Sequence, residues 1–274
     1  MDNADAADQT VVWSIVGNTD SGTKIDAVTS GTATLTVSAK ETARSLTVVA
    51  AHTDYTGVEY EGTLVVENTL AAITDTINAI TPGSTDTVTV DGIEWYVLAK
   101  DTANSRALLL SQRILEKRPF GNNVSSWKNS TLRTYLNGEW LDKYHTVKTT
   151  AVEVTLYSQI GIYNAAVDTT QDKVFLLSQA DVFGTWYNST ADQAVTDTRL
   201  YTYNGAPLAL KDNGTLKEAV MLDGTNYSWW LRSPYINTNN IAAVSRDGGT
   251  INPINYNCGS SVGVRPAFWF DLSK

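Results

Sequence analysis

The chain has 274 residues, of which 42% are hydrophobic and 18% are charged, and it carries a net charge of −9 with an isoelectric point near 4.7. This composition is typical of a folded protein of one or two domains, and the negative charge argues against nucleic acid or an anionic membrane as a partner. No apolar run reaches the roughly 18 to 20 residues of a membrane-spanning helix, so we expect no membrane insertion.

The first part of the chain predicts an all-β domain. Residues 1–8 are acidic and lack the apolar region of a secretory signal peptide, so we expect no signal peptide in this chain. Residues 10–16, 32–37, 45–51 and 62–66 are rich in β-branched and apolar side chains, with turn residues between them. Four short strands in this arrangement predict a β-sandwich.

This segment resembles the bacterial immunoglobulin-like (Ig-like) domains of phage structural proteins and surface adhesins. The resemblance rests on four stretches: Val12-Trp13-Ser14, Gly22-Thr23-Lys24-Ile25, Leu35-Thr36-Val37 and Leu46-Thr47-Val48-Val49-Ala50. Such domains carry one or two strands before the Val-Trp-Ser strand, and almost nothing precedes it here. We therefore expect a sandwich that is incomplete at its N-terminus: either the chain begins part-way through a larger sequence, or a neighbouring segment or chain covers the exposed edge.

A junction at residues 69–85 separates this domain from the rest. It ends in Thr81-Pro82-Gly83-Ser84, a turn signal. We place the boundary near residue 78, which gives an Ig-like domain at 1–78 and a second domain at 79–274. At the start of the second domain, residues 87–99 predict a hairpin that turns at Asp91-Gly92, and residues 107–111 predict a short buried strand.

Two helices are expected in the second domain. The first spans residues 130–144 with Ser130 as its N-cap, and four apolar residues share one of its faces: Leu132, Tyr135, Leu136 and Trp140. Residues 174–177 predict an apolar strand. Residues 178–181 follow it and have the pattern of a capping box, so a second helix begins there, and Gly184 limits its length.

The last fifty residues combine aromatic ends with a polar centre. Residues 227–234 and 263–270 are dense in large apolar side chains and predict a rigid frame, built on Trp229, Trp230, Arg232, Arg265 and Pro266. The residues between them offer amide, hydroxyl and phenol groups, which suit recognition and are equally typical of loops without a ligand. The candidate ligand-binding residues are Tyr235, Asn237, Asn239, Asn240, Ser245, Asn252, Asn255, Tyr256, Asn257, Ser260 and Ser261.

Residues 86–274 resemble the prokaryotic and phage branch of the C-type-lectin-like fold. The resemblance rests on the order of the hairpin, the helix at 127–141, the strand-to-helix unit at 175–181 and the paired motifs at 229–234 and 263–268. Within that branch the chain resembles the variable proteins of diversity-generating retroelements, in which adenine-directed copying errors randomise codons near the C-terminus and favour Asn codons. The resemblance implies an α+β C-type-lectin-like domain with two helices, a mostly antiparallel sheet and a diversified binding face.

Other residues carry weaker signals for chemistry. Arg232 and Arg265 could bind anions, but we favour buried clamps for both. Most tryptophans predict core rather than a sugar platform, although Trp229 and Trp230 should face opposite sides of a strand, so that one of them could reach the surface. The acids are dispersed, so we expect no metal and no cofactor. One cysteine, Cys258, excludes an internal disulfide.

We therefore expect a non-enzymatic ligand- or receptor-binding protein, either an adhesin or a phage tail receptor-binding protein. Its partner would be a protein or glycan receptor on a cell surface, and its location a phage tail or the bacterial cell surface. One alternative is a carbohydrate- or cell-wall-acting hydrolase that uses acidic residues in the C-terminal loops, with carboxylates about 5 to 9.5 Å apart. A second alternative is a structural virion component that buries the same face against a neighbour.

Overall fold

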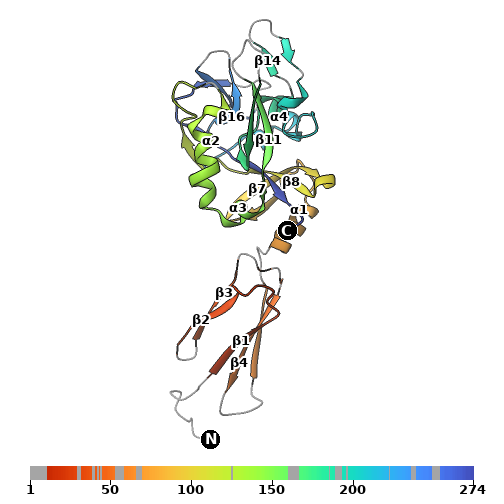
Figure 1. Ribbon diagram of the computed structural model, residues 1–274, viewed down its shortest axis with the longest axis vertical. Helices are drawn as coiled ribbons and strands as arrows, with labels where there is room; N and C mark the ends of the chain where they lie inside the picture. The colour runs from red at the N-terminus through yellow and green to blue at the C-terminus, as the bar shows by residue number, and fades with distance from the viewer. Residues whose placement is uncertain are drawn as a thin grey trace. The chain divides into compact units, whose positions relative to one another are not determined.

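The computed structural model describes most of the chain: residues 11–29, 32–38, 41, 43, 45–52, 59–65, 70–124, 126–159, 167–184, 186–188, 193–195, 197–221, 223–235, 239–248 and 254–274. Contacts within the chain divide it into Met1–Thr76 (unit 1) and Ile77–Lys274 (unit 2), where the sequence-based division was 1–78 and 79–274. Strands account for 42% of the structure, and the helices are few and short (Figure 1).

The fold class predicted from the sequence is wrong. An α+β C-type-lectin-like domain with two helices, preceded by an Ig-like sandwich, was expected, but the structure is mostly β and its strands form several small sheets. Many of the individual strands were correctly predicted. Hydrophobic alternation identifies a strand and its buried side, but it does not determine which strands pair or how many sheets they form.

The described residues of unit 1 form two separate sheets. β1 (Val11–Val16) pairs antiparallel with β4 (Ser45–His52), which pairs with β5 (Glu59–Val65), whereas β2 (Lys24–Thr29) and β3 (Thr32–Thr36) form their own antiparallel pair. β2 was missed by the sequence analysis. The face of β1 that carries Val12 and Val16 is exposed, at 54% and 57%. The expectation of missing N-terminal strands concerns residues 1–10, which lie outside the described residues.

A central sheet of unit 2 joins its first and last strands. Its path is β10 (Ala151–Val152), β20 (Ala267–Asp271), β8 (Arg106–Ser111), β7 (Ile93–Asp101) and β6 (Thr87–Val90), and β13 (Val174–Phe175) also pairs with β20. The predicted hairpin is confirmed, because Asp91 and Gly92 connect β6 to β7 with φ of 50° and 74°. Left-handed backbone at both positions is the requirement of a type I′ turn. Trp95 packs edge-on against Phe268, with ring centroids 4.9 Å apart.

A second sheet of unit 2 has β16 (Trp229–Pro234) at its centre, and all six residues of this strand are buried. The order is β18 (Ile254–Asn257), β17 (Asn240–Val244), β16, β19 (Val262–Val264) and β9 (Glu116–Arg118). Only the β16–β19 pair in this sheet is parallel. A Cβ atom at Gly263 would lie 2.7 Å from the backbone oxygen of Ser228, so the close approach of these two strands requires glycine.

The helix predicted at residues 130–144 is broken in the structure. Ser130 caps α2 (Thr131–Tyr135) as predicted, because its hydroxyl accepts a hydrogen bond from the backbone N–H of Arg133 at 3.0 Å. The next segment, η3 (Leu136–Trp140), has five-residue spacing and contains Gly138 at φ −126° and ψ −105°. Gly138 adopts this non-helical backbone and interrupts the regular helix.

The second predicted helix is confirmed as α4 (Gln179–Phe183). Ser178 and Asp181 form the expected capping box, and Gly184 ends the helix at φ 76°. The strand before it is shorter than expected, because only Val174 and Phe175 are paired.

The remaining described elements are the helix α1, within which the division between the units falls, and the short helices and two strand pairs of unit 2. They are α1 (Leu70–Ala79), η1 (Thr102–Asn104), η2 (Trp127–Asn129), α3 (His145–Thr150), β11 (Val154–Gln159) with β12 (Val167–Asp172), β14 (Trp186–Asn188) with β15 (Gln193–Val195), η4 (Thr198–Leu200), η5 (Ala209–Asp212) and α5 (Gly214–Lys217). Among the described residues, none of the helices combines the length and the apolar character that crossing a membrane would require.

Candidate functional site

Arg232 is a buried clamp that holds three segments of unit 2 together. Its side chain is 1% exposed, and its guanidinium donates to the backbone oxygens of Leu176 and Leu200 at 3.0 and 3.1 Å. It also donates to the carboxylate of Asp181 at 3.0 Å, and Asp181 is itself 0% exposed. Its Nη1 also donates to the hydroxyl of Thr202 at 3.2 Å, and its Nε has no hydrogen-bond partner among the described residues. Because this buried cation is paired with a carboxylate and two carbonyl oxygens inside the protein, Arg232 serves packing and not the binding of an external anion.

Arg265 is a second buried clamp, and it has no carboxylate partner among the described residues. Its Nε and Nη1 donate to the backbone oxygens of Ser111 and Leu216 at 2.7 and 2.6 Å, and its Nη2 has no hydrogen-bond partner there. The guanidinium lies 4.9 Å from the ring centroid of Trp229. Burial penalises the charged form and lowers the pKa of Arg265 to about 9, so the side chain is still charged at neutral pH.

The two adjacent tryptophans of β16 point to opposite sides of the strand, and both are 0% exposed. Trp229 donates its indole N–H to the backbone oxygen of Lys217 at 2.9 Å, and Trp230 donates to that of Arg118 at 2.8 Å. Trp230 also packs against Phe120 at 5.8 Å. Neither tryptophan reaches the surface, so neither offers a sugar-stacking platform.

Three of the candidate asparagines share one face at the edge of the second sheet. β17 and β18 pair with Asn240 opposite Asn257 and with Ala242 opposite Asn255. Because paired residues and alternate residues of a strand project to the same side, Asn240, Asn255 and Asn257 lie on one face. Asn255 and Asn257 are exposed, and the amide of Asn240 donates to that of Asn255 at 2.8 Å. We call these three residues the amide surface.

Tyr256 projects to the opposite face of β18. It is half-buried against Trp230, with ring centroids 6.1 Å apart, and its hydroxyl lies 3.2 Å from that of Ser228. It therefore belongs to the packing of the sheet and does not extend the amide surface. Its proximity in the chain to Asn255 and Asn257 predicted a shared face, whereas alternation in a strand separates it from them.

The remaining candidate residues lie in the turns around this sheet or outside the described residues. Asn237 and Asn252 are outside them. Asn257 also has a local role, because its side-chain oxygen accepts from the backbone N–H of Gly259 at 2.9 Å, as in an Asx turn. Of the other five candidates, Ser261 is exposed, and four are half-buried: Tyr235, Asn239, Ser245 and Ser260.

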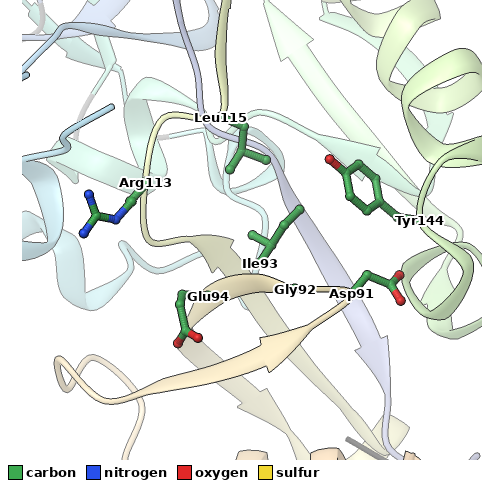
Figure 2. Close-up of a pocket in the computed structure, with 7 residues that line it drawn as sticks. All are labelled: Asp91, Gly92, Ile93, Glu94, Arg113, Leu115 and Tyr144. Atoms are coloured by element: carbon green, nitrogen blue, oxygen red, sulfur yellow. The ribbon is translucent and has the colours of Figure 1, made fainter. Parts of the chain in front are cut away.

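A second feature of unit 2 is a hollow of about 360 Å³ beside the Asp91-Gly92 turn, which the sequence analysis did not find (Figure 2). We call it the hairpin hollow, and it is lined by Asp91, Gly92, Ile93, Glu94, Arg113, Leu115 and Tyr144. These residues come from the β6–β7 turn and the start of β7, the segment after β8 and the residue before α3. Of this hollow, the sequence indicated only the Asp91-Gly92 turn. The segment after β8 and Tyr144 are far from the turn in the sequence, and only the folding of the chain brings them beside it.

Apolar groups form the centre of this hollow, and charged groups form its rim. In Figure 2, the side chains of Ile93 and Leu115 and the hydroxyl of Tyr144 point toward one another. The carboxylates of Asp91 and Glu94 and the guanidinium of Arg113 point away from this centre. The arrangement suits binding of a partly apolar ligand better than the two-carboxylate chemistry of glycoside hydrolysis, for which both carboxylates would have to flank the same substrate bond.

The described residues contain no group of three or more His, Cys, Asp or Glu side chains placed to hold a metal ion. Cys258 is buried and free. Asp172, a buried acid of unit 2, accepts hydrogen bonds from Trp127, Arg133 and Thr170 and so joins η2, α2 and β12.

Comparison with known proteins identifies one family. The model of a family described as a domain of unknown function, DUF6273, matches residues 104–272 of this chain, and the chain belongs to that family. No curated protein and no solved structure matches it. These findings do not relate the chain to a diversity-generating retroelement or to a C-type-lectin-like protein.

Proposed function

We propose that this protein is a non-enzymatic binding protein of a phage tail or bacterial surface, which contacts a protein or glycan receptor through the amide surface. The observation that carries the proposal is the shared face of Asn240, Asn255 and Asn257 at the edge of a sheet whose central strand is wholly buried. Asparagine amides both donate and accept hydrogen bonds, so they suit polar receptor groups.

The frame beneath this surface supports the same proposal. Arg232, Arg265 and the two tryptophans of β16 make their hydrogen bonds to backbone oxygens, to Asp181 and to the hydroxyl of Thr202, and none of these bonds involves the amide surface. Substitutions at the surface should therefore leave the frame intact, because changes away from special structural features usually alter stability by less than about 0.5 kcal/mol. Such independence is what a surface needs if its sequence is to vary.

The binding test compares the double variant Asn240→Ala/Asn255→Ala with the unchanged protein on arrays of bacterial surface glycans and surface proteins. We expect the unchanged protein to bind a defined subset and the variant to lose affinity roughly tenfold, because two ligand hydrogen bonds are removed. The melting temperature should stay within about 2 °C. Lys117→Ala, an exposed position in β9 at the other edge of the same sheet, is the matched control and should keep its binding.

Two results would count against the proposal. One is receptor binding that survives the double substitution, or no binding to any member of the arrays. The other is a large fall in melting temperature for the double variant, which would make the asparagines part of the frame.

We also propose that this surface is a target of sequence diversification, and the DNA beside the gene tests this. A near-identical repeat that differs only at adenines, next to a reverse transcriptase gene, is the expected arrangement. If the gene has neither of these neighbours, diversification by a retroelement is ruled out, and the binding proposal remains to be judged by the array experiment.

A further inference from the structure

We propose that the hairpin hollow is a second binding site, which takes a small molecule with one apolar ring and a carboxylate group. Its volume of about 360 Å³ falls at the lower end of the roughly 300 to 1,000 Å³ typical of small-molecule sites. Ile93 and Leu115 supply an apolar floor, and the ring of Tyr144 is held in place by packing against Trp140, with centroids 4.6 Å apart. Such a space suits a single ring.

Both acidic side chains of the hollow already have partners inside the protein. The carboxylate of Asp91 accepts a hydrogen bond from the backbone N–H of Val147 in α3 at 2.9 Å. The carboxylate of Glu94 accepts from the hydroxyls of Thr87 and Thr89 at 2.5 and 2.6 Å. These bonds hold the two carboxylates at the rim and turned away from the centre, so they are poorly placed to attract a cation into the hollow.

Arg113 is the charged group of the hollow with unused hydrogen-bonding capacity. A guanidinium has five N–H donors, and the one hydrogen bond of this side chain within the described residues runs from Nη1 to the backbone oxygen of Met221 at 3.4 Å. That length is beyond the usual range for such a bond, and Arg113 has no ion-pair partner among the described acids within 4.0 Å. The guanidinium points away from the centre of the hollow (Figure 2), so binding of a ligand there requires this half-buried side chain to turn inward, and it would give up only this one long hydrogen bond.

The chemistry of the ligand follows from these donors. A planar guanidinium pairs with a carboxylate through two parallel hydrogen bonds. The hydroxyl of Tyr144 points into the hollow and has no hydrogen-bond partner within the described part of the chain, so it offers a further donor. An apolar ring over Ile93 and Leu115 with its carboxylate at Arg113 would use every unengaged group of the site.

Phenylacetate is the probe for the test, and the full chain labelled with ¹⁵N is the protein. We expect saturable shifts of the backbone amides of Gly92 and Ile93, and binding at least about fivefold weaker for phenylacetamide and benzylamine, which lack the carboxylate. Arg113→Met should weaken phenylacetate binding by a similar factor and leave phenylacetamide unchanged. Arg246→Met, at an exposed arginine outside the hollow, is the matched control and should change neither.

Other results would overturn the assignment. If phenylacetate produces no saturable shift at Gly92 and Ile93, the hollow is not this kind of site. If the acid and the amide bind equally, or if Arg246→Met weakens binding as much as Arg113→Met, Arg113 does not select the carboxylate. Asn240→Ala/Asn255→Ala should bind phenylacetate normally, so failure of this site and failure of the amide surface are distinguishable.

Discussion

The buried pair of Asp181 and Arg232 allows a quantitative test of how unit 2 is held together. The carboxylate of Asp181 accepts five hydrogen bonds: from the backbone and hydroxyl of Ser178, the backbone and hydroxyl of Thr202, and the guanidinium of Arg232. Asp181→Asn keeps the size of the side chain but leaves the guanidinium buried without a counter-charge. Breaking such a pair costs about 3–5 kcal/mol, which is a large part of the roughly 5–15 kcal/mol that stabilises a typical domain.

Arg232→Met should cost less than Asp181→Asn, because four donors still stabilise the remaining carboxylate. The double variant contains neither charge, so its loss should be smaller than the sum of the single losses by about 2–3 kcal/mol. Urea unfolding followed by tryptophan fluorescence measures unit 2, since Trp13 is the one tryptophan of the eight that lies in unit 1. Single effects that add to within about 0.5 kcal/mol would show that the two charges do not stabilise each other.

Two further predictions concern a titrating group and a glycine. Burial alone would raise the pKa of Glu41, but hydrogen bonds from the hydroxyls of Thr19 and Thr23 and from backbone N–H groups outweigh it and lower the pKa to about 2. This carboxylate should therefore stabilise unit 1 above pH 4.5, the ordinary pKa of Glu, and this stabilisation should be lost as the pH falls toward 2. The measurement is an NMR titration of the Thr19 amide, and a midpoint near pH 4.5 would contradict the prediction. Gly263→Ala should destabilise unit 2 by about 1–3 kcal/mol in urea, because its Cβ would meet Ser228 at 2.7 Å, whereas Gly214→Ala, with open space around it, should not.

Features governed by neighbouring residues were predicted well from the sequence. Ser130 as a cap, the capping box of Ser178 and Asp181 and the turn at Asp91-Gly92 all appear where they were expected. Each depends on hydrogen bonds or backbone angles within about four residues, so the local sequence contains the necessary information. The break at Gly138 was missed because one glycine in an amphipathic pattern does not by itself indicate an interruption.

Features that depend on distant contacts could not be predicted in this way. Asp181 and Arg232 are separated by 51 positions, and Ser111 and Arg265 by 154. The fold class was predicted wrongly for the same reason: the pairing of strands depends on distant contacts, so correctly predicted strands were assigned to the wrong sheets. All three residues of the amide surface were among the candidates named from the sequence, but so was Tyr256, which the alternation of β18 places on the opposite face.

The two proposed sites lie on different sheets of unit 2, and Arg265 connects those sheets. Its Nε bonds to Ser111, the last residue of β8 and two positions before Arg113 of the hairpin hollow. Its guanidinium also lies over the ring of Trp229 in β16, the central strand of the sheet that carries the amide surface. A buried cation is costly, but here one side chain supports the backbone beside both sites. We infer that Arg265 keeps each site in position relative to the core, so that binding residues at either site can change without loss of the shared frame.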